Sequence, residues 1–210
     1  MKRAVREQTK ALLDPAVASG LYDLVPKPVR PAGAPAIVLM MGFPGVGKSH
    51  CARLLADRLG AAHMASDHLR SQLFIAASYG RRENAALFRI LDVLIERLVG
   101  EGHRVIVDAT HLRRIYRAST VALARRRGVP YAYVLVVADD ADARQRLRDR
   151  ARARAEDDRS EADEEVYDAM RARGFEEPDE PYLTLRNGRD LDGEVARIAM
   201  ELGARWAAAS

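Results

Sequence analysis

The sequence predicts an α/β fold in which helices cover both faces of a parallel sheet, and two observations lead to this prediction. Short apolar runs of strand length alternate with longer segments whose apolar residues repeat at helical spacing. Strands that alternate with helices are typical of parallel sheets with right-handed crossovers, which bind ligands at the carboxyl ends of their strands. The length of 210 residues suits a single hydrophobic core, so we expect one domain.

Residues 1–35 are expected to precede this domain as an N-terminal extension. Residues 1–25 predict a short helix, a turn and a second short segment, and the Pro-rich stretch 26–35 predicts a stiff connector on the outside of the core. The domain of residues 36–210 then opens with the apolar run 36–41, which is typical of a buried parallel strand.

A glycine-rich loop follows this first strand. Residues 42–49 read Gly-Phe-Pro-Gly-Val-Gly-Lys-Ser and fit the pattern of Gly, four residues, then Gly-Lys-Ser/Thr. Apolar residues at helical spacing over 50–59 predict a helix directly after the loop. Strand, loop and helix therefore have the order that a phosphate-binding loop requires, and they predict a P-loop NTPase fold. The alternative is a glycine turn between two core elements.

This loop predicts binding of ATP with Mg²⁺. Glycines let successive backbone N–H groups and the helix N-terminus face the phosphates. The Lys48 ammonium can reach the β and γ phosphates, and the Ser49 hydroxyl can bind the metal. The predicted nucleotide-binding residues are Gly42, Pro44, Gly45, Val46, Gly47, Lys48, Ser49 and His50.

The remaining elements are predicted in chain order from apolar periodicity and from Gly and Pro breaks. They are a short strand at 61–65, a helix from 67 towards 77, a helix over 87–98, a strand at 104–108, a helix over 113–127, a strand at 131–137, an Arg-rich helix from about 139, a helix over 161–173, a short strand at 182–185 and a closing helix over 191–206.

Asp67 lies just past the carboxyl end of the second strand, at the edge expected to face the nucleotide. A carboxylate there can accept the proton of an acceptor hydroxyl as it attacks the γ phosphorus. Arg70, one helical turn later, can hold an anionic group on the acceptor. The alternative is that Asp67 only caps its helix. We predict Asp67 as the catalytic base.

Asp108 ends another apolar strand, and Thr110 and His111 follow it in a loop. Asp108 can bind a water of Mg²⁺ or the acceptor, and we count Asp108 and Thr110 among the substrate-binding residues. The alternative for Asp108 is a cap of the next helix. His111 is predicted to be a surface loop residue.

Six arginines crowd the helix that begins near residue 139: Arg144, Arg146, Arg148, Arg150, Arg152 and Arg154. Ala143, Leu147 and Ala151 form only a narrow apolar stripe, which predicts a lightly seated helix. A lid over about 139–162 would place one or two guanidiniums on the γ phosphate and exclude water. Arg146 and Arg150 share a face, and we favour Arg150. The acidic run 156–165 predicts a solvated connection.

The composition indicates the compartment in which the protein is expected to work. The formal net charge of +4 comes with a strong preference for Arg and Ala, which is also typical of high-GC genomes. The single Cys51 excludes an internal disulfide and predicts a buried thiol in a reducing compartment. The charged N-terminus and the absence of a long apolar stretch predict a soluble cytoplasmic protein without a membrane span.

Taken together, residues 37–181 resemble the AAA_33 group of P-loop kinases, relatives of polynucleotide 5′-hydroxyl kinases, zeta-toxin-type kinases and chloramphenicol phosphotransferase. The motifs that carry the resemblance are the loop 42–49, Ser-Asp-x-x-Arg at 66–70, Tyr79-Gly80 with Asn84, the segment 102–110 with Arg117, Arg-Leu-x-x-Arg at 146–150, and 160–162. The resemblance implies that Asp67 is the general base and Arg150 the lid cation. The Asp-Ala-Thr-Asn common in the family reads Asp-Ala-Thr-His here, so the acceptor contact of that Asn is open.

We therefore expect a kinase that moves the γ phosphoryl of ATP to an acceptor hydroxyl, with Arg70 and Arg117 orienting the acceptor. A 5′-hydroxyl nucleic-acid end ranks first as acceptor, because Asp67 with Arg70 resembles the base and clamp of polynucleotide kinases. A small-molecule kinase acting on a sugar, nucleoside or antibiotic follows closely. A nucleotide-dependent switch without an acceptor is a rival of another class. The preference for ATP over GTP and the oligomeric state are left open.

Overall fold

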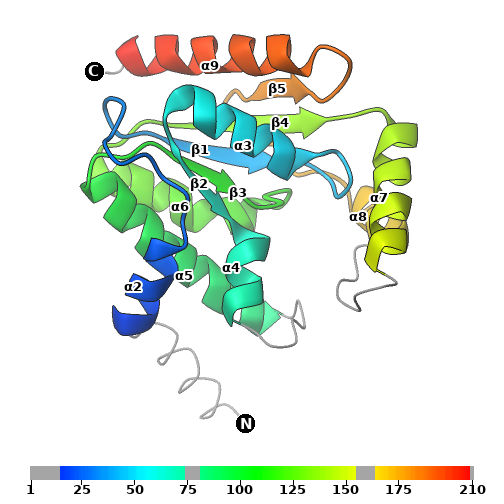
Figure 1. The fold of residues 1–210 in the computed structure, drawn as a ribbon, viewed down its shortest axis with the longest axis horizontal. Helices are drawn as coiled ribbons and strands as arrows, with labels where there is room; N and C mark the ends of the chain where they lie inside the picture. Colours follow the sequence, from blue (N-terminus) through cyan, green and yellow to red (C-terminus); the bar gives the residue numbers. More distant parts are fainter. Residues whose placement is uncertain (1–14, 74–80, 155–163, 209–210) are drawn as a thin grey trace.

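The computed structural model describes residues 15–73, 81–154 and 164–208. Within these residues, helices alternate with strands along the chain (Figure 1). The elements are α2 (Pro15–Asp23), β1 (Ile37–Met41), α3 (Lys48–Leu59), β2 (Ala62–Ala65), α4 (Ser66–Leu73), α5 (Arg81–Gly100), β3 (Val105–Asp108), α6 (Arg114–Arg127), β4 (Tyr131–Val137), α7 (Asp140–Arg154), α8 (Glu164–Arg173), β5 (Leu183–Arg186) and α9 (Leu191–Ala208).

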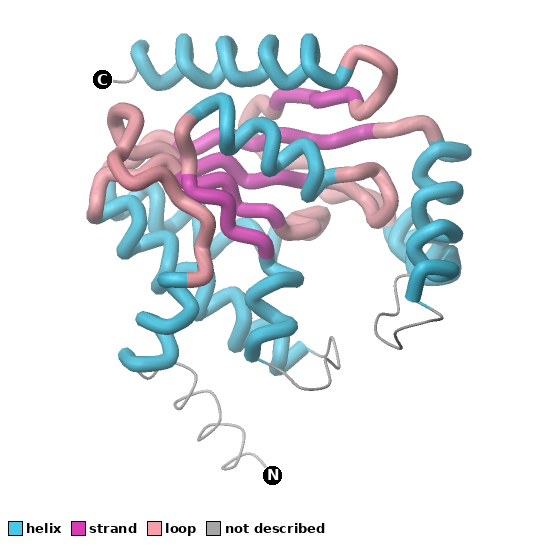
Figure 2. The backbone as a smooth tube through the Cα atoms, in the orientation of Figure 1, coloured by secondary structure: helices cyan, strands magenta, loops and turns pink. Residues whose placement is uncertain are grey.

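The five strands form one parallel sheet in the order β2-β3-β1-β4-β5, which confirms the predicted fold class. Helices α3 and α9 cover one face of the sheet, and α5 and α6 cover the other (Figures 1 and 2). The pair α7 and α8 lies beyond the carboxyl ends of the central strands. The sheet is therefore buried on both faces, as parallel sheets usually are.

Strand β1 occupies the centre of the sheet, and all five of its residues are buried. Val38 and Met40 pack towards α3 and α9, whereas Ile37, Leu39 and Met41 pack towards α5 and α6. A strand with apolar neighbours on both faces has to be apolar at every position. This explains why the run 36–41 shows no alternation.

Strand register brings three chain segments to the same edge. Met40 of β1 and Ala65 of β2 are both register partners of Asp108 in β3. The glycine-rich loop, the start of α4 and the loop after β3 therefore leave the sheet side by side. This is the edge at which parallel sheets bind ligands.

Most predicted boundaries agree with the structure to within a few residues, but α7 is seated differently from the prediction. Ala143 and Leu147 are buried in the main core, and Ala151 is exposed. The first half of α7 is thus firmly packed, and the expectation of a lightly seated helix is wrong for that half. The proposed lid residues 155–162, Ser160 among them, and Tyr79-Gly80 lie outside the described residues.

The N-terminal segment enters the description at α2, and the earlier part of the predicted first helix lies outside it. In the Pro-rich connector, residues 29–34 are exposed, and the Pro26 carbonyl accepts a hydrogen bond from the His63 backbone N–H. The connector thus runs along the edge of the sheet at β2. Within the described residues, no helix has the length and apolar character needed to cross a membrane.

Candidate functional site

The glycine-rich loop joins β1 to α3 at the centre of the sheet edge. Gly45 and Gly47 have φ angles of 79° and 81°, which favour glycine. A Cβ added at Gly45 would lie 2.5 Å from the Ala143 carbonyl oxygen of α7. No side-chain cap bonds the α3 N-terminus, so its free N–H groups are available to an anion. The loop is a cradle that side chains would fill, and it fits the phosphates of a nucleotide.

Lys48 and Asp108 form an ion pair beneath this loop. The Asp108 carboxylate is buried, and its second oxygen lies 3.3 Å from His63 Nε2. Burial acts to raise the pKa of Asp108, but the Lys48 ammonium and hydrogen bonds from His63, Lys48 and Ser49 outweigh it and hold this pKa below its usual range. Asp108 is therefore a permanent anion next to the Lys48 and Ser49 side chains.

These residues also fit a magnesium ion. Mg²⁺ prefers oxygen ligands and usually keeps several waters while the substrate phosphates supply further ligands. The Ser49 hydroxyl and the Asp108 carboxylate are the oxygen donors next to the loop. Within the described part of the chain, no group of three or more His, Cys, Asp or Glu side chains is placed to hold a metal by itself. This donor set suits a metal that arrives with the nucleotide.

Asp67 lies in the first turn of α4, exposed to solvent. The helix begins one residue earlier, at Ser66, so Asp67 is inside the helix rather than at the capping position weighed for it. A carboxylate in the first turn is favoured by the helix dipole. Asp67 is thus accessible to an acceptor from solvent, as a catalytic base has to be.

Arg70 is buried, and it pairs with Glu83 and donates to Asn84 Oδ1 at 2.7 Å. Both partners belong to the first turn of α5. The pair joins α4 to α5 and neutralises the charge of Arg70. An acceptor that relied on Arg70 would have to share it with Glu83.

Arg117 is also buried, and its guanidinium donates to two backbone carbonyl oxygens. The oxygens are those of His111 and Glu176, each at 2.6 Å. These bonds tie the loop after β3 to the segment before β5. Thr110 lies next to the glycine-rich loop, since its carbonyl oxygen accepts from the Gly42 N–H at 3.4 Å.

His111 is fully buried, so its prediction as a surface residue is wrong. It has a φ of 45°, unusual for a residue other than glycine, and its Nδ1 lies 3.0 Å from the Met40 carbonyl oxygen. Because a carbonyl only accepts, Nδ1 carries the proton. Burial lowers the pKa of His111 to about 4. The apolar neighbours Ala109 and Leu112, both buried, were the available sequence signal for this burial.

Among the α7 arginine side chains that the structure describes, some pair with carboxylates, whereas Arg146 contacts the glycine-rich loop. Arg144 pairs with Asp140 and with Asp168 of α8, and Arg148 pairs with Glu164. Arg146 is half-buried and its Nη1 lies 3.4 Å from the Gly45 carbonyl oxygen. Arg150, the favoured lid cation, is exposed one turn further along. The structure thus brings Arg146, rather than Arg150, to the glycine-rich loop.

Cys51 and His50 follow the loop on α3. Cys51 is buried, and desolvation raises the pKa of its thiol to about 11, so it is the inert core residue that was expected. His50 is exposed, and its Nδ1 lies 3.1 Å from an Arg53 guanidinium nitrogen.

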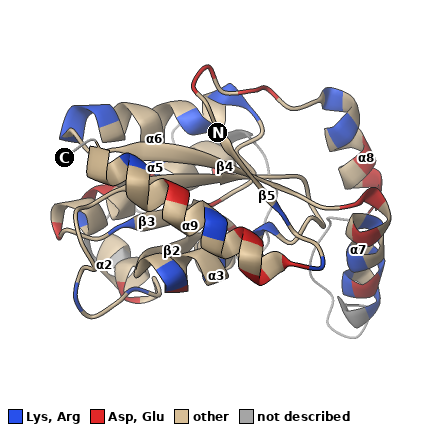
Figure 3. Cartoon of the chain, turned by 90° about the horizontal axis from the view of Figure 1, so that it is seen from above, with Lys and Arg blue, Asp and Glu red and all other residues tan. Residues whose placement is uncertain are grey.

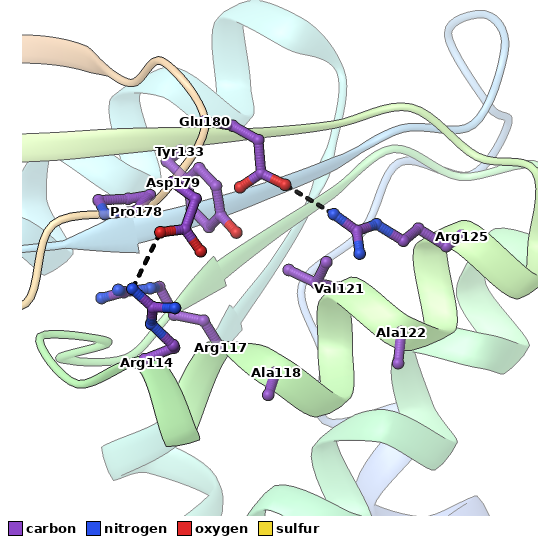
Figure 4. Close-up of a pocket in the computed structure, with 10 residues that line it drawn as sticks. All are labelled: Arg114, Arg117, Ala118, Val121, Ala122, Arg125, Tyr133, Pro178, Asp179 and Glu180. Carbon is purple, nitrogen blue, oxygen red and sulfur yellow. Dashed lines mark hydrogen bonds and ion pairs between the residues drawn. The ribbon is translucent and has the colours of Figure 1, made fainter.

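A pocket of about 420 Å³ lies away from the glycine-rich loop, between α6 and the segment 178–180 (Figure 4). Its wall includes Arg117 and the Tyr133 ring, and its rim holds the ion pairs Arg114–Asp179 and Arg125–Glu180. None of its lining residues belongs to the loop or to the Lys48–Asp108 pair. The arrangement of charges at the sheet edge, rather than this pocket, marks the candidate site.

Comparisons with known proteins show the family and the fold. The AAA_33 family, described as an AAA domain, matches residues 37–178. The search of curated proteins found no significant match. Among solved structures, the Mycobacterium tuberculosis APS kinase CysC, in complex with AMPPNP and APS, is 22% identical, with a TM-score of 0.62 over 81% of this chain and 99% of that chain.

Two further solved structures are similar. Chaetomium thermophilum Kti12, in complex with ADP-AlF3, is 20% identical with a TM-score of 0.65 over 81% of this chain and 98% of that chain. A gluconokinase from Sinorhizobium meliloti 1021 is 16% identical with a TM-score of 0.54 over 82% and 98%. At these identities the likeness is one of fold. The match over residues 37–178 shows the family: the chain belongs to the AAA_33 family, and it has the P-loop kinase fold.

Proposed function

We propose that this protein is a kinase that binds ATP with Mg²⁺ and transfers the γ phosphoryl group to a hydroxyl of a small molecule. The observation that carries the proposal is the Lys48–Asp108 ion pair, which lies with Ser49 at the glycine-rich loop. No side chain caps the α3 N-terminus that follows this loop. In this arrangement a cation, a permanent anion and a hydroxyl meet where the phosphates and their metal would lie.

Each residue has a role that its position supports. The N–H groups of the loop and of the α3 N-terminus would hold the phosphates, and Lys48 would turn from Asp108 to the β and γ phosphates. Ser49 would hold Mg²⁺, and Asp108 would hold one of its waters. The metal would neutralise the charge on the phosphates during transfer.

The transfer itself needs a base and an accessible acceptor. Asp67 would accept the proton of the acceptor hydroxyl while the hydroxyl oxygen forms its bond to the γ phosphorus. The bond from that phosphorus to the β–γ bridging oxygen would break, and ADP would leave with that oxygen. Arg146, next to the loop, would stabilise the charge that develops on the transferred group.

The charged residues that the structure describes favour a small acceptor over a nucleic-acid end, which ranked first in the analysis of the sequence. On α4 and α7, three arginines are paired with carboxylates: Arg70 with Glu83, Arg144 with Asp168 and Arg148 with Glu164. Basic and acidic residues are interspersed along α9 (Figure 3). A phosphate backbone binds best to a continuous basic surface. The names of the APS kinase and the gluconokinase among the similar structures also support a small acceptor.

Transfer of label from γ-labelled ATP tests this proposal. The acceptors should be sugars, nucleosides, adenylyl compounds and hydroxylated antibiotics, together with 5′-hydroxyl DNA and RNA oligonucleotides, and GTP should replace ATP in a parallel series. Labelling of a small molecule that is lost in Lys48→Ala and Asp67→Asn supports the proposal. Labelling of oligonucleotides that falls steeply with salt would show that the acceptor is a nucleic-acid end rather than a small molecule. Nucleotide binding without any transfer would support a nucleotide-dependent switch.

A further inference from the structure

Asn187 reaches the glycine-rich loop from the opposite end of the chain. It directly follows β5, and its backbone N–H donates to the Val137 carbonyl oxygen at 2.8 Å, which fixes it at the carboxyl end of β4. Its side chain is buried, and Nδ2 donates to the Val46 carbonyl oxygen at 2.8 Å. A Cβ added at Gly47 would overlap Nδ2 of Asn187, so the two residues are in close contact.

This hydrogen bond determines which way one peptide group of the loop faces. A trans peptide is planar, and its C=O and N–H point in opposite directions. The Val46 C=O and the Gly47 N–H belong to the same peptide group. When Asn187 holds the carbonyl oxygen on its own side, the Gly47 N–H has to point to the other side of the loop.

Arg146 acts on the preceding peptide group in the same sense. Its Nη1 lies 3.4 Å from the Gly45 carbonyl oxygen, a longer and weaker contact. The Val46 N–H shares that peptide group. Two successive N–H groups of the loop are thus oriented by side chains outside it, one from α7 and one from the segment after β5.

We propose that Asn187 is a positioning residue for the phosphate-binding loop: it holds the Val46 carbonyl away from the phosphates and aims the Gly47 N–H at them. Without this bond the Val46–Gly47 peptide is able to turn and present a carbonyl dipole to the anion. This inference rests on the proposed function only in taking a nucleotide phosphate as the ligand of the loop. It also accounts for glycine at position 47, where any side chain would meet the Asn187 amide.

The test compares Asn187→Asp, Asn187→Ala and the control Thr184→Ala, whose side chain is exposed on β5. Asp has the size of Asn but its carboxylate cannot donate to Val46, and it adds a negative charge near the phosphates. Dissociation constants of ADP, ATP and adenosine are measured by calorimetry on the full chain, together with KM and kcat for ATP. Thermal unfolding checks that each variant is folded.

We expect Asn187→Ala to raise the dissociation constants of ADP and ATP about 10-fold, which is the effect of losing one neutral hydrogen bond. Asn187→Asp should raise both constants further. Adenosine affinity should not change, and KM for ATP should rise more than kcat falls. Unchanged ADP affinity in folded variants, or equal loss for ADP and adenosine, would overturn the inference. If the wild type binds ATP but labels no acceptor, the kinase proposal fails while the role of Asn187 stands. If the wild type binds neither nucleotide, both fail.

Discussion

The Lys48 ammonium and the Asp108 carboxylate meet beneath the glycine-rich loop, although 60 residues separate them in the chain. Both side chains are largely shielded from solvent, and each is the partner of the other in an ion pair. A nucleotide phosphate therefore has to compete with Asp108 for Lys48. Removing the anion and removing the cation should have opposite effects on nucleotide binding.

Asp108→Asn should separate nucleotide binding from catalysis. Without Mg²⁺, ATP should bind more tightly, because Lys48 no longer pairs with an anion and less negative charge faces the phosphates. With Mg²⁺, turnover should fall roughly 10- to 100-fold, because the carboxylate proposed to hold a metal-bound water is lost. Calorimetry with and without Mg²⁺ and steady-state kinetics measure both. Asp57→Asn, an exposed position on α3, is the matched control. Equal turnover in the two variants would exclude a role for Asp108 in catalysis.

Asp67→Asn should lower kcat by roughly 100-fold or more, the usual loss when a general base is removed. The KM for ATP and the melting temperature should stay close to those of the wild type, because Asp67 is exposed and Asn is tolerated in the first turn of a helix. Kinetics and thermal unfolding check this. A loss of stability with unchanged kcat would show that Asp67 supports only the helix.

Arg146→Ala should reduce transfer much more than Arg150→Ala. The Arg146 guanidinium contacts the Gly45 carbonyl, whereas Arg150 is exposed. Loss of an arginine that stabilises the transferred group lowers kcat by about 1000-fold in other P-loop enzymes, whereas an exposed arginine should matter little. The two single variants and the wild type are compared in kcat at saturating ATP. A larger loss in Arg150→Ala would mean that α7 shifts when the nucleotide binds and would restore the residue favoured from the sequence.

His111 should make the protein less stable as the pH falls from about 6.5 to about 4. In this range the unfolded state binds a proton at its imidazole and the folded state does not, because burial lowers the pKa of His111 from 6.5 to about 4. The contribution is fully present above the unfolded pKa and declines below it. It amounts to up to roughly 3 kcal/mol.

The check is urea unfolding at several pH values for the wild type and for His111→Asn. The variant should show a shallower decrease of the unfolding free energy between pH 6.5 and 4, whatever its stability at neutral pH. Parallel curves for the two proteins would mean that His111 is protonated in the folded state or reached by water.

The glycine-rich loop and its place in the fold could be predicted from the sequence because the residues that determine them are local. The conformation of the loop 42–49 follows from neighbouring residues. These are glycines at the turns, Lys48 and Ser49 at the start of a helix, and an apolar strand before them. The positions of Asp67 and Asp108 at this edge could also be predicted, since a polar residue after a buried strand of a parallel sheet lies at the edge where such sheets bind ligands.

Contacts between distant segments could not be predicted. Arg70 was expected to hold an acceptor, but it pairs with Glu83 on a separate helix. His111 was expected at the surface, but the packing of its loop against β1 buries it. Asn187 was not predicted as a site residue, because no pattern in the neighbouring sequence indicates a contact with a loop 141 residues earlier.

The sequence by itself determined the fold class, the phosphate-binding loop and the sheet edge at which the candidate site lies. These features follow from short-range periodicity and from the backbone conformations that Gly allows. Both depend only on residues that are close together in the sequence. Only the tertiary structure decided the partners of Arg70, Arg117, Arg146 and Asn187. A charge or amide acquires its role from the groups that the crossovers of the sheet bring next to it, and that proximity is a property of the packed chain.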